Sequence, residues 1–180
     1  MKKTILLLVI ILLTLSCKNE PTNTETNEVE TIHGFVRTLE NTQMAGMLGD
    51  TALNEFYVNV NYDASVFPNP VFDSAVVLNL DIVERDVYQI SITPANGSDE
   101  LKDDLEEQLE IDMSVYPYYN ERIHIIVRDD VLDMGRNIIQ LKTEDFLEGF
   151  NFIEIYRYKN GEELVEEPTK IPVFVVKNDK

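Results

Sequence analysis

Few side chains in this chain could carry covalent or metal chemistry. One cysteine, Cys17, and two histidines, His33 and His124, stand among 180 residues. A single thiol cannot close a disulfide within the chain. The histidines lack a cysteine partner and lie outside any HExxH pattern, so a zinc site would need carboxylates that folding brings together. His124 is expected to face solvent or a neighbouring carboxylate on its strand.

Motifs that specify a reaction are also missing from the sequence. It contains no GxSxG elbow, no Walker loop and no dinucleotide fingerprint. We therefore assign no catalytic residue and expect a protein that is not an enzyme. A hydrolase whose acidic site is assembled by folding stays open as an alternative, because such groups converge only in space.

An acidic cluster offers a weak candidate for a metal site. Asp129, Asp130 and Asp133 could supply the hard oxygen ligands that calcium needs, but their spacing does not match an EF-hand loop. The alternative is that they are solvated carboxylates of a turn. No other metal or cofactor is expected.

Three tyrosines around a proline are the candidate for partner contact. Tyr116, Tyr118 and Tyr119 flank Pro117, which would give rigid amphipathic contact area with little entropy to lose. The alternative is that two of the rings close the end of the core while the third keeps its hydroxyl in water. The chain has no tryptophan, which disfavours a sugar-stacking platform.

The residues before Cys17 form a pattern that bears on the role of its thiol. Two lysines precede the apolar run of residues 5–13, and Ser16 is a small residue directly before the cysteine. These are the parts of a secretory signal peptide, and the run is shorter than the roughly 20 residues of a bilayer span. We therefore expect residues 1–16 to be removed. An ordinary signal peptide with an incidental cysteine, or an uncleaved anchor, is the alternative.

The residues Leu13-Thr14-Leu15-Ser16-Cys17 resemble the lipobox of bacterial lipoproteins. This resemblance implies that Cys17 becomes the N-terminus and carries acyl chains on its sulfur and nitrogen, so that the membrane contact is lipid. Lys18 stands where some families carry an aspartate that retains lipoproteins at the inner membrane. The resemblance therefore favours an outer-membrane lipoprotein, facing either the periplasm or the cell surface.

Composition and charge divide the rest of the chain. Residues 17–31 are rich in Thr, Asn and Glu, which predicts a flexible tether after the lipidated cysteine. Residues 32–180 are long enough for one domain with a substantial core. The formal net charge is −18, so the chain should repel phosphate backbones and we expect no nucleic-acid partner.

Apolar residues at every second position predict a mainly β fold. We expect strands at 56–62, 76–82, 88–92, 123–127, 137–142, 150–158 and 171–176. The strands at 76–82 and 88–92 are predicted to pair as an antiparallel hairpin, and Asn160-Gly161 to form a turn. Short strands separated by Asn, Gly, Pro and acidic turns predict a single antiparallel β-sandwich.

Two segments resemble known sandwich domains. Residues 141–155, LKTEDFLEGFNFIEI, resemble the corner before the penultimate strand of immunoglobulin-like domains, with Asn151 where that family has a tyrosine. The segment Phe67-Pro68-Asn69-Pro70 is similar to the opening of sorting domains in a bacterial secretion system. The first resemblance implies an immunoglobulin-like architecture, and the second bears on the architecture alone.

One segment departs from the strand pattern. Leu101, Leu105 and Leu109 recur at four-residue spacing among acidic residues, which predicts one short helix over residues 98–110. Asn96 or Ser98 could cap it, and it is expected to lie across one end of the sandwich. An acidic loop is the alternative.

These observations together predict a membrane-anchored lipoprotein whose sandwich is a non-catalytic binding or accessory module of the cell envelope or surface. The lipid anchor and tether would raise the effective concentration of the domain near other membrane proteins. The alternatives are a calcium- or carbohydrate-dependent adhesion module and the hydrolase described above. The protein partner is not identified by any motif.

Overall fold

The computed structural model describes residues 28–39, 43–53, 62–72, 75–160, 163–164 and 167–176. Cys17, the expected signal peptide and most of the strand expected at 56–62 lie outside these residues. Within the described ranges, no helix combines the length and the apolar character needed to cross a membrane.

Strands make up most of the described chain. Its elements in order are β1 (Thr31–Ile32), β2 (Gly34–Thr38), β3 (Met44–Gly49), the 3-10 turn η1 (Thr51–Leu53), β4 (Tyr62–Phe67), β5 (Val76–Ile82), β6 (Asp86–Pro94), β7 (Asn96–Gly97), α2 (Asp99–Leu109), η2 (Met113–Val115), β8 (Ile125–Leu132), β9 (Gly135–Leu141), η3 (Thr143–Asp145), β10 (Gly149–Lys159), β11 (Glu163–Leu164) and β12 (Thr169–Val175). The folded part begins slightly before the expected boundary at Ile32, because the backbone oxygen of Glu30 already accepts a hydrogen bond from the Asn96 amide at 2.9 Å.

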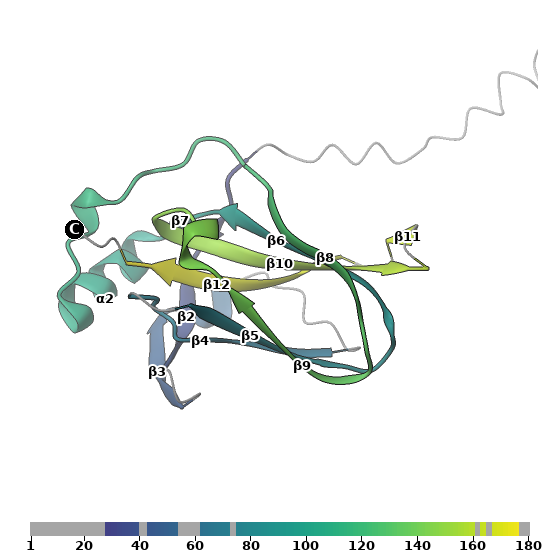
Figure 1. Ribbon diagram of the computed structural model, residues 1–180. Coiled ribbons are helices and arrows are strands. Elements are labelled where there is room, and N and C mark those ends of the chain that lie inside the picture. Colours follow the sequence, from purple (N-terminus) through teal and green to yellow (C-terminus); the bar gives the residue numbers. More distant parts are fainter. Residues whose placement is uncertain are drawn as a thin grey trace, which may run out of the picture.

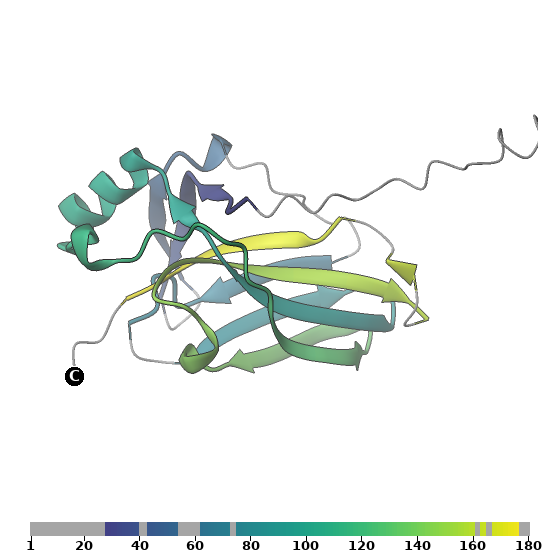
Figure 2. The same cartoon turned by 90° about the horizontal axis from the view of Figure 1, so that it is seen from above.

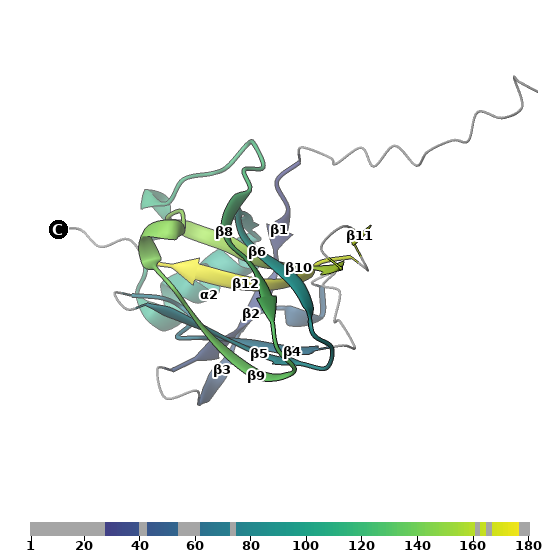
Figure 3. The same cartoon turned by 45° about the vertical axis from the view of Figure 1, so that its right-hand side comes forward.

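Two antiparallel sheets pack face to face as a sandwich (Figure 3). The larger sheet has the order β12-β10-β6-β8, and β11 pairs with the far end of β10. The smaller sheet has the order β4-β5-β9. A separate hairpin joins β2 to β3, and β1 pairs in parallel with β7. The prediction of a mainly β sandwich with one short helix is confirmed.

Alternate residues of the strands fill the space between the two sheets. Leu78 and Leu80 of β5, Ile90 and Ile92 of β6, and Ile153 of β10 are fully buried there. Burying a side chain of this size contributes about 1.5–3 kcal/mol relative to leaving it exposed. This inner layer therefore holds the two sheets together.

The connection between β5 and β6 shows that the hairpin predicted for these strands is wrong. β5 pairs with β4 and β9, whereas β6 pairs with β10 and β8, so residues 83–85 carry the chain from one sheet to the other. Arg157 of β10 holds this crossing, because its guanidinium binds Asp86 at 2.8 Å and also pairs with Glu84. Apolar alternation is the same whether two strands pair or face each other, so the pattern alone did not separate the two arrangements.

A second core lies on the outer side of the larger sheet, at one end of the sandwich. Phe150 and Phe152 of β10 and Phe174 of β12 contribute to it, and α2, β2 and β3 lie at the same end of the molecule (Figure 1, Figure 2). The Phe150 and Phe174 rings meet edge to face with centroids 4.8 Å apart. Because of this second core, the first half of β10 is buried on both faces.

The helix predicted for residues 98–110 is confirmed as α2. The Ser98 hydroxyl caps it by accepting a hydrogen bond from the Leu101 amide at 3.3 Å. Leu101 and Leu105 are fully buried in the second core, while acidic residues such as Asp103 and Glu107 stay exposed. The apolar stripe therefore attaches this acidic segment to the end of the sandwich, as expected.

The corner before β10 is built by Asn151, which lies near the start of that strand. Its amide nitrogen donates to the Leu147 oxygen at 2.7 Å and to the Gly149 oxygen at 2.9 Å. Its amide oxygen accepts from the Leu147 amide at 3.2 Å. Gly149 has φ of 89°, a conformation that glycine adopts without strain. The asparagine therefore closes the corner with its own short-range hydrogen bonds.

Replacing Asn151 with alanine is expected to lower the free energy of unfolding by about 2 kcal/mol, because three hydrogen bonds are lost at a fully buried position. Asn137 is a matched control. Like Asn151, it donates to the backbone oxygens of the residues four and two positions before it, Asp133 and Gly135, but it is half-exposed. Water can replace its bonds, so Asn137→Ala should change stability by less than about 1 kcal/mol. Urea unfolding measures both, and equal losses would contradict this role for Asn151.

Candidate functional site

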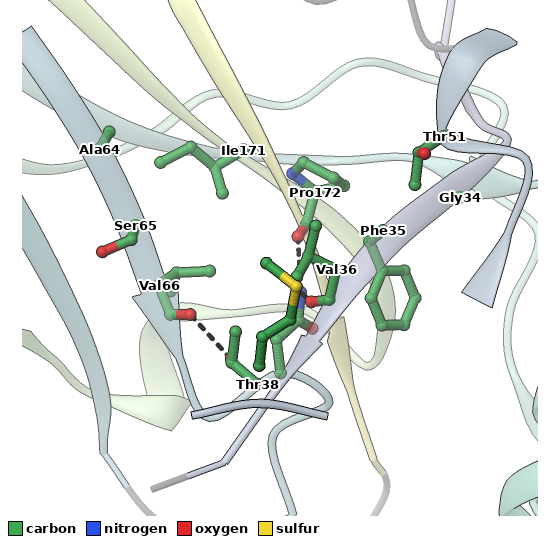
Figure 4. Close-up of a pocket in the computed structure, with 12 residues that line it drawn as sticks. Gly34, Phe35, Val36, Thr38, Thr51, Ala64, Ser65, Val66, Ile171 and Pro172 are labelled. Atoms are coloured by element: carbon green, nitrogen blue, oxygen red, sulfur yellow. Dashed lines mark hydrogen bonds between the residues drawn. The ribbon is translucent and has the colours of Figure 1, made fainter. Parts of the chain in front are cut away.

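A pocket opens on the side of the sandwich where β4 and β12 come together and β2 forms a third wall (Figure 4). Its volume is about 400 Å³. We refer to it as the apolar pocket. Its lining residues are Gly34, Phe35, Val36, Thr38, Met44, Thr51, Ala64, Ser65, Val66, Asn69, Ile171 and Pro172.

Hydrogen bonds fix the walls of the apolar pocket relative to one another. The Thr38 hydroxyl on β2 donates to the Val66 oxygen on β4 at 2.9 Å, as the dashed line to Val66 in Figure 4 marks. Asn69 is buried, and its amide nitrogen donates to the Pro172 oxygen at 2.9 Å. Its amide oxygen accepts from the Phe174 amide at 3.1 Å. The pocket is therefore held open by the fold itself.

These same bonds leave the interior of the pocket apolar and uncharged. The side chains of Thr38 and Asn69 are turned to backbone partners, and no titratable side chain of the described residues lines the cavity. Val36, Ala64 and Ile171 supply aliphatic surface on three sides. A pocket of this kind favours an apolar group, because a polar group would lose its water without gaining a partner.

Exposed apolar side chains lie on β3 and η1, each of which contributes a residue to the pocket lining. On β3, Met44 is 72% and Met47 62% exposed, and Leu53 of η1 is 56% exposed. Methionine is flexible and polarisable, so exposed methionines suit binding surfaces that must adapt to a partner. We call Met44, Met47 and Leu53 the methionine rim.

The three tyrosines predicted to contact a partner do not form one shared surface. Tyr116 packs its ring on Phe174, with centroids 4.9 Å apart, at the margin of the second core. Tyr119 is half-buried, and its hydroxyl donates to the Glu148 oxygen at 2.7 Å. Burial, helped by the charge of Glu148, raises the pKa of Tyr119. Of the three, only Tyr118 is largely exposed, at 70%.

The three aspartates of the calcium candidate are not brought together. Asp129 and Asp130 are neighbours on β8, so their side chains point to opposite faces of the sheet. Asp130 pairs with Arg128 at 3.1 Å, and Asp133 pairs with Arg85 at 2.9 Å. In the part of the chain that the structure describes, no group of three or more His, Cys, Asp or Glu side chains could hold a metal ion. These aspartates therefore do not make up a calcium site.

A buried charge cluster lies on the outer face of the larger sheet, and the sequence did not single it out. Glu154 of β10 is fully buried; Arg122 contacts one carboxylate oxygen at 2.7 Å and the Tyr156 hydroxyl donates to the other at 2.7 Å. Lys170 lies 3.8 Å from the oxygen that Arg122 contacts. Burial opposes the charge of Arg122, but Glu154 and Glu30 outweigh it and raise its pKa.

Ser91, His124 and Glu154 meet on this outer face and have the residue types of a catalytic triad. His124, directly before β8, has its Nδ1 3.4 Å from a carboxylate oxygen of Glu154 on β10, so the neighbouring carboxylate does not lie on the same strand, contrary to the expectation. The Ser91 hydroxyl, however, makes no hydrogen bond to His124 or to any other described residue. In this geometry Ser91 therefore lacks the hydrogen bond of about 3 Å to a general base that a nucleophilic serine uses.

Comparisons of this chain with known proteins found no match. No protein-family model matches the chain, and neither a curated protein nor a solved structure matches it. The function is therefore argued from the shape and chemistry of the described surfaces.

Proposed function

We propose that this chain is a lipoprotein of the bacterial cell envelope, anchored in the outer membrane through Cys17, and that its sandwich is a non-catalytic binding module. The apolar pocket is the observation that carries the binding role. It is preformed, it has an uncharged interior, and the exposed Met44 of the methionine rim is part of its lining. The residues around Cys17 support the anchor, as the lipobox resemblance implies.

The occupant that fits the apolar pocket best is an apolar side chain on an extended segment of another envelope protein. Among the described strands β4 pairs with β5 alone, so its other edge could take an incoming strand at the backbone groups before Val66, whose oxygen already accepts from Thr38. Ala64 and Val66 of β4 line the pocket, which places an alternate side chain of such a strand inside it.

Charge complementarity specifies the partner further. The chain carries a net charge of −18, and Asp63 on β4 is exposed beside the pocket residue Ala64. A partner segment with basic residues next to its apolar side chain would be steered to this edge and held there. The tether and anchor raise the effective concentration of the domain near membrane-bound partners, so a modest affinity is sufficient.

A photo-reactive amino acid at Ser65, on the pocket wall, tests this proposal in intact cells. We expect the photo-reactive residue in place of Ser65 to crosslink to one discrete envelope protein, because the partner strand would lie along β4. The same amino acid at Gln140, exposed on β9 at the opposite edge of the smaller sheet, is the control. Equal crosslinking from Ser65 and Gln140, or none from Ser65, would refute binding at the pocket.

A further inference from the structure

A second cavity lies on the outer face of the larger sheet and shares no lining residue with the apolar pocket. Its volume is about 290 Å³. It is lined by Gln89, Ser91, His124, Ile126, Tyr156 and Tyr158. We refer to it as the polar cleft. In contrast to the apolar pocket, nearly all of its lining side chains can form hydrogen bonds.

Ser91 is the observation that marks the polar cleft as a ligand site. The residue is 1% exposed, and its hydroxyl has no hydrogen-bond partner among the described residues. A buried hydroxyl without a partner destabilises the fold, so such groups are rare in native structures and call for an explanation. Because Ser91 lines the cleft, a ligand hydroxyl bound there would provide the missing partner.

The two tyrosines of the cleft are fixed by hydrogen bonds. The Tyr156 hydroxyl donates to Glu154 at 2.7 Å, and the Tyr158 hydroxyl donates to Gln89 at 3.1 Å. Both tyrosines line the cleft, so they form part of the surface that a ligand would contact. Ile126 is 60% exposed and adds an apolar surface beside them.

The charges beneath the cleft are balanced. Arg122 and Lys170 are matched by Glu154 and Glu30, and none of these four residues lines the cleft. The cleft therefore attracts neither an anion nor a cation strongly, and the net negative charge of the chain further opposes anions. Its chemistry suits a neutral ligand that has several hydroxyls and one apolar face.

We propose that the polar cleft binds one hexose unit of a neutral glycan. A sugar hydroxyl would pair with Ser91, the rest of the ring would contact Tyr156 and Tyr158, and its apolar face would lie against Ile126. This site is independent of the apolar pocket and adds a glycan contact to the proposed protein contact.

Titration of the folded domain with the methyl glycosides of glucose, galactose and mannose, followed by NMR, tests the proposal. We expect saturable shifts of cleft residues with at least one sugar at millimolar concentration, and an affinity at least about tenfold weaker in Ser91→Ala. Ser65→Ala, in the apolar pocket, is the control and should bind normally. No saturable shift with any of the three sugars, or equal binding by Ser91→Ala, would overturn the proposal.

The thermal stability of the same variant without sugar gives a second readout. Removing a buried hydroxyl that lacks a partner should raise the melting temperature of Ser91→Ala by about 2–4 °C. A lower melting temperature would mean that the hydroxyl has a structural partner in the folded protein, and the proposal would then be wrong.

Discussion

Replacing Glu154 with alanine should lower the free energy of unfolding by about 3–5 kcal/mol. The carboxylate is fully buried, and Arg122 and Lys170 lie around it with side chains only 15% and 12% exposed. Without Glu154 these cations would remain buried with less compensating charge. The Tyr156 hydroxyl would also lose its acceptor. Urea unfolding followed by circular dichroism measures the loss.

Two further variants separate buried charge from other effects of the Glu154 change. Glu154→Gln keeps the shape and an acceptor oxygen but not the charge. It should therefore lower the free energy of unfolding by less than Glu154→Ala does. Glu144 forms an exposed pair with Lys142 at 3.0 Å, and Glu144→Ala should lower stability by less than about 1 kcal/mol. If Glu154→Ala were no worse than Glu144→Ala, the cluster would not contribute to the stability of the sheet.

Replacing Cys17 with serine should abolish membrane attachment altogether. Each buried acyl CH₂ contributes about 0.8 kcal/mol, so several chains on Cys17 would hold the protein almost irreversibly, whereas serine would carry none of them. The measurement is incorporation of labelled palmitate together with the share of protein that sediments with membranes.

Ser16→Ala is the matched control for Cys17→Ser, because alanine is also a small residue before the cleavage site. It should keep both the palmitate label and membrane sedimentation. Label that persists in Cys17→Ser, or wild-type protein that carries no label, would contradict the proposed anchor.

The strands and the helix could be predicted because their apolar periodicity is local. Leu101 and Leu105 at helical spacing, and Leu78 and Leu80 at strand spacing, are all buried as expected. The pairing of β5 and β6 could not be predicted, because long-range contacts such as Arg157 with Asp86 decide it. Local pattern therefore predicts the elements, and tertiary contacts choose their partners.

The candidate sites could be predicted from the sequence much less well than the strands and the helix. The apolar pocket is made by β2, β4 and β12, which are distant in the chain, so no local sequence motif could predict it. Glu154 sits in a strand where alternation suggests a solvated position, yet Arg122 and Lys170 from other segments bury it. One signal was present: the apolar residues of β10 stand on both sides of Glu154, which is typical of a strand covered on both faces.

The crosslink from Ser65 in cells that carry Ala64→Phe is the most direct test of the central claim, that the apolar pocket holds a partner of the anchored domain. Ala64 lines the pocket and also packs against the core between the sheets, so phenylalanine should fill part of the cavity at some cost in stability. We expect the crosslinked product to fall at least about tenfold relative to the unfilled pocket. An unchanged yield from folded Ala64→Phe protein would contradict the claim.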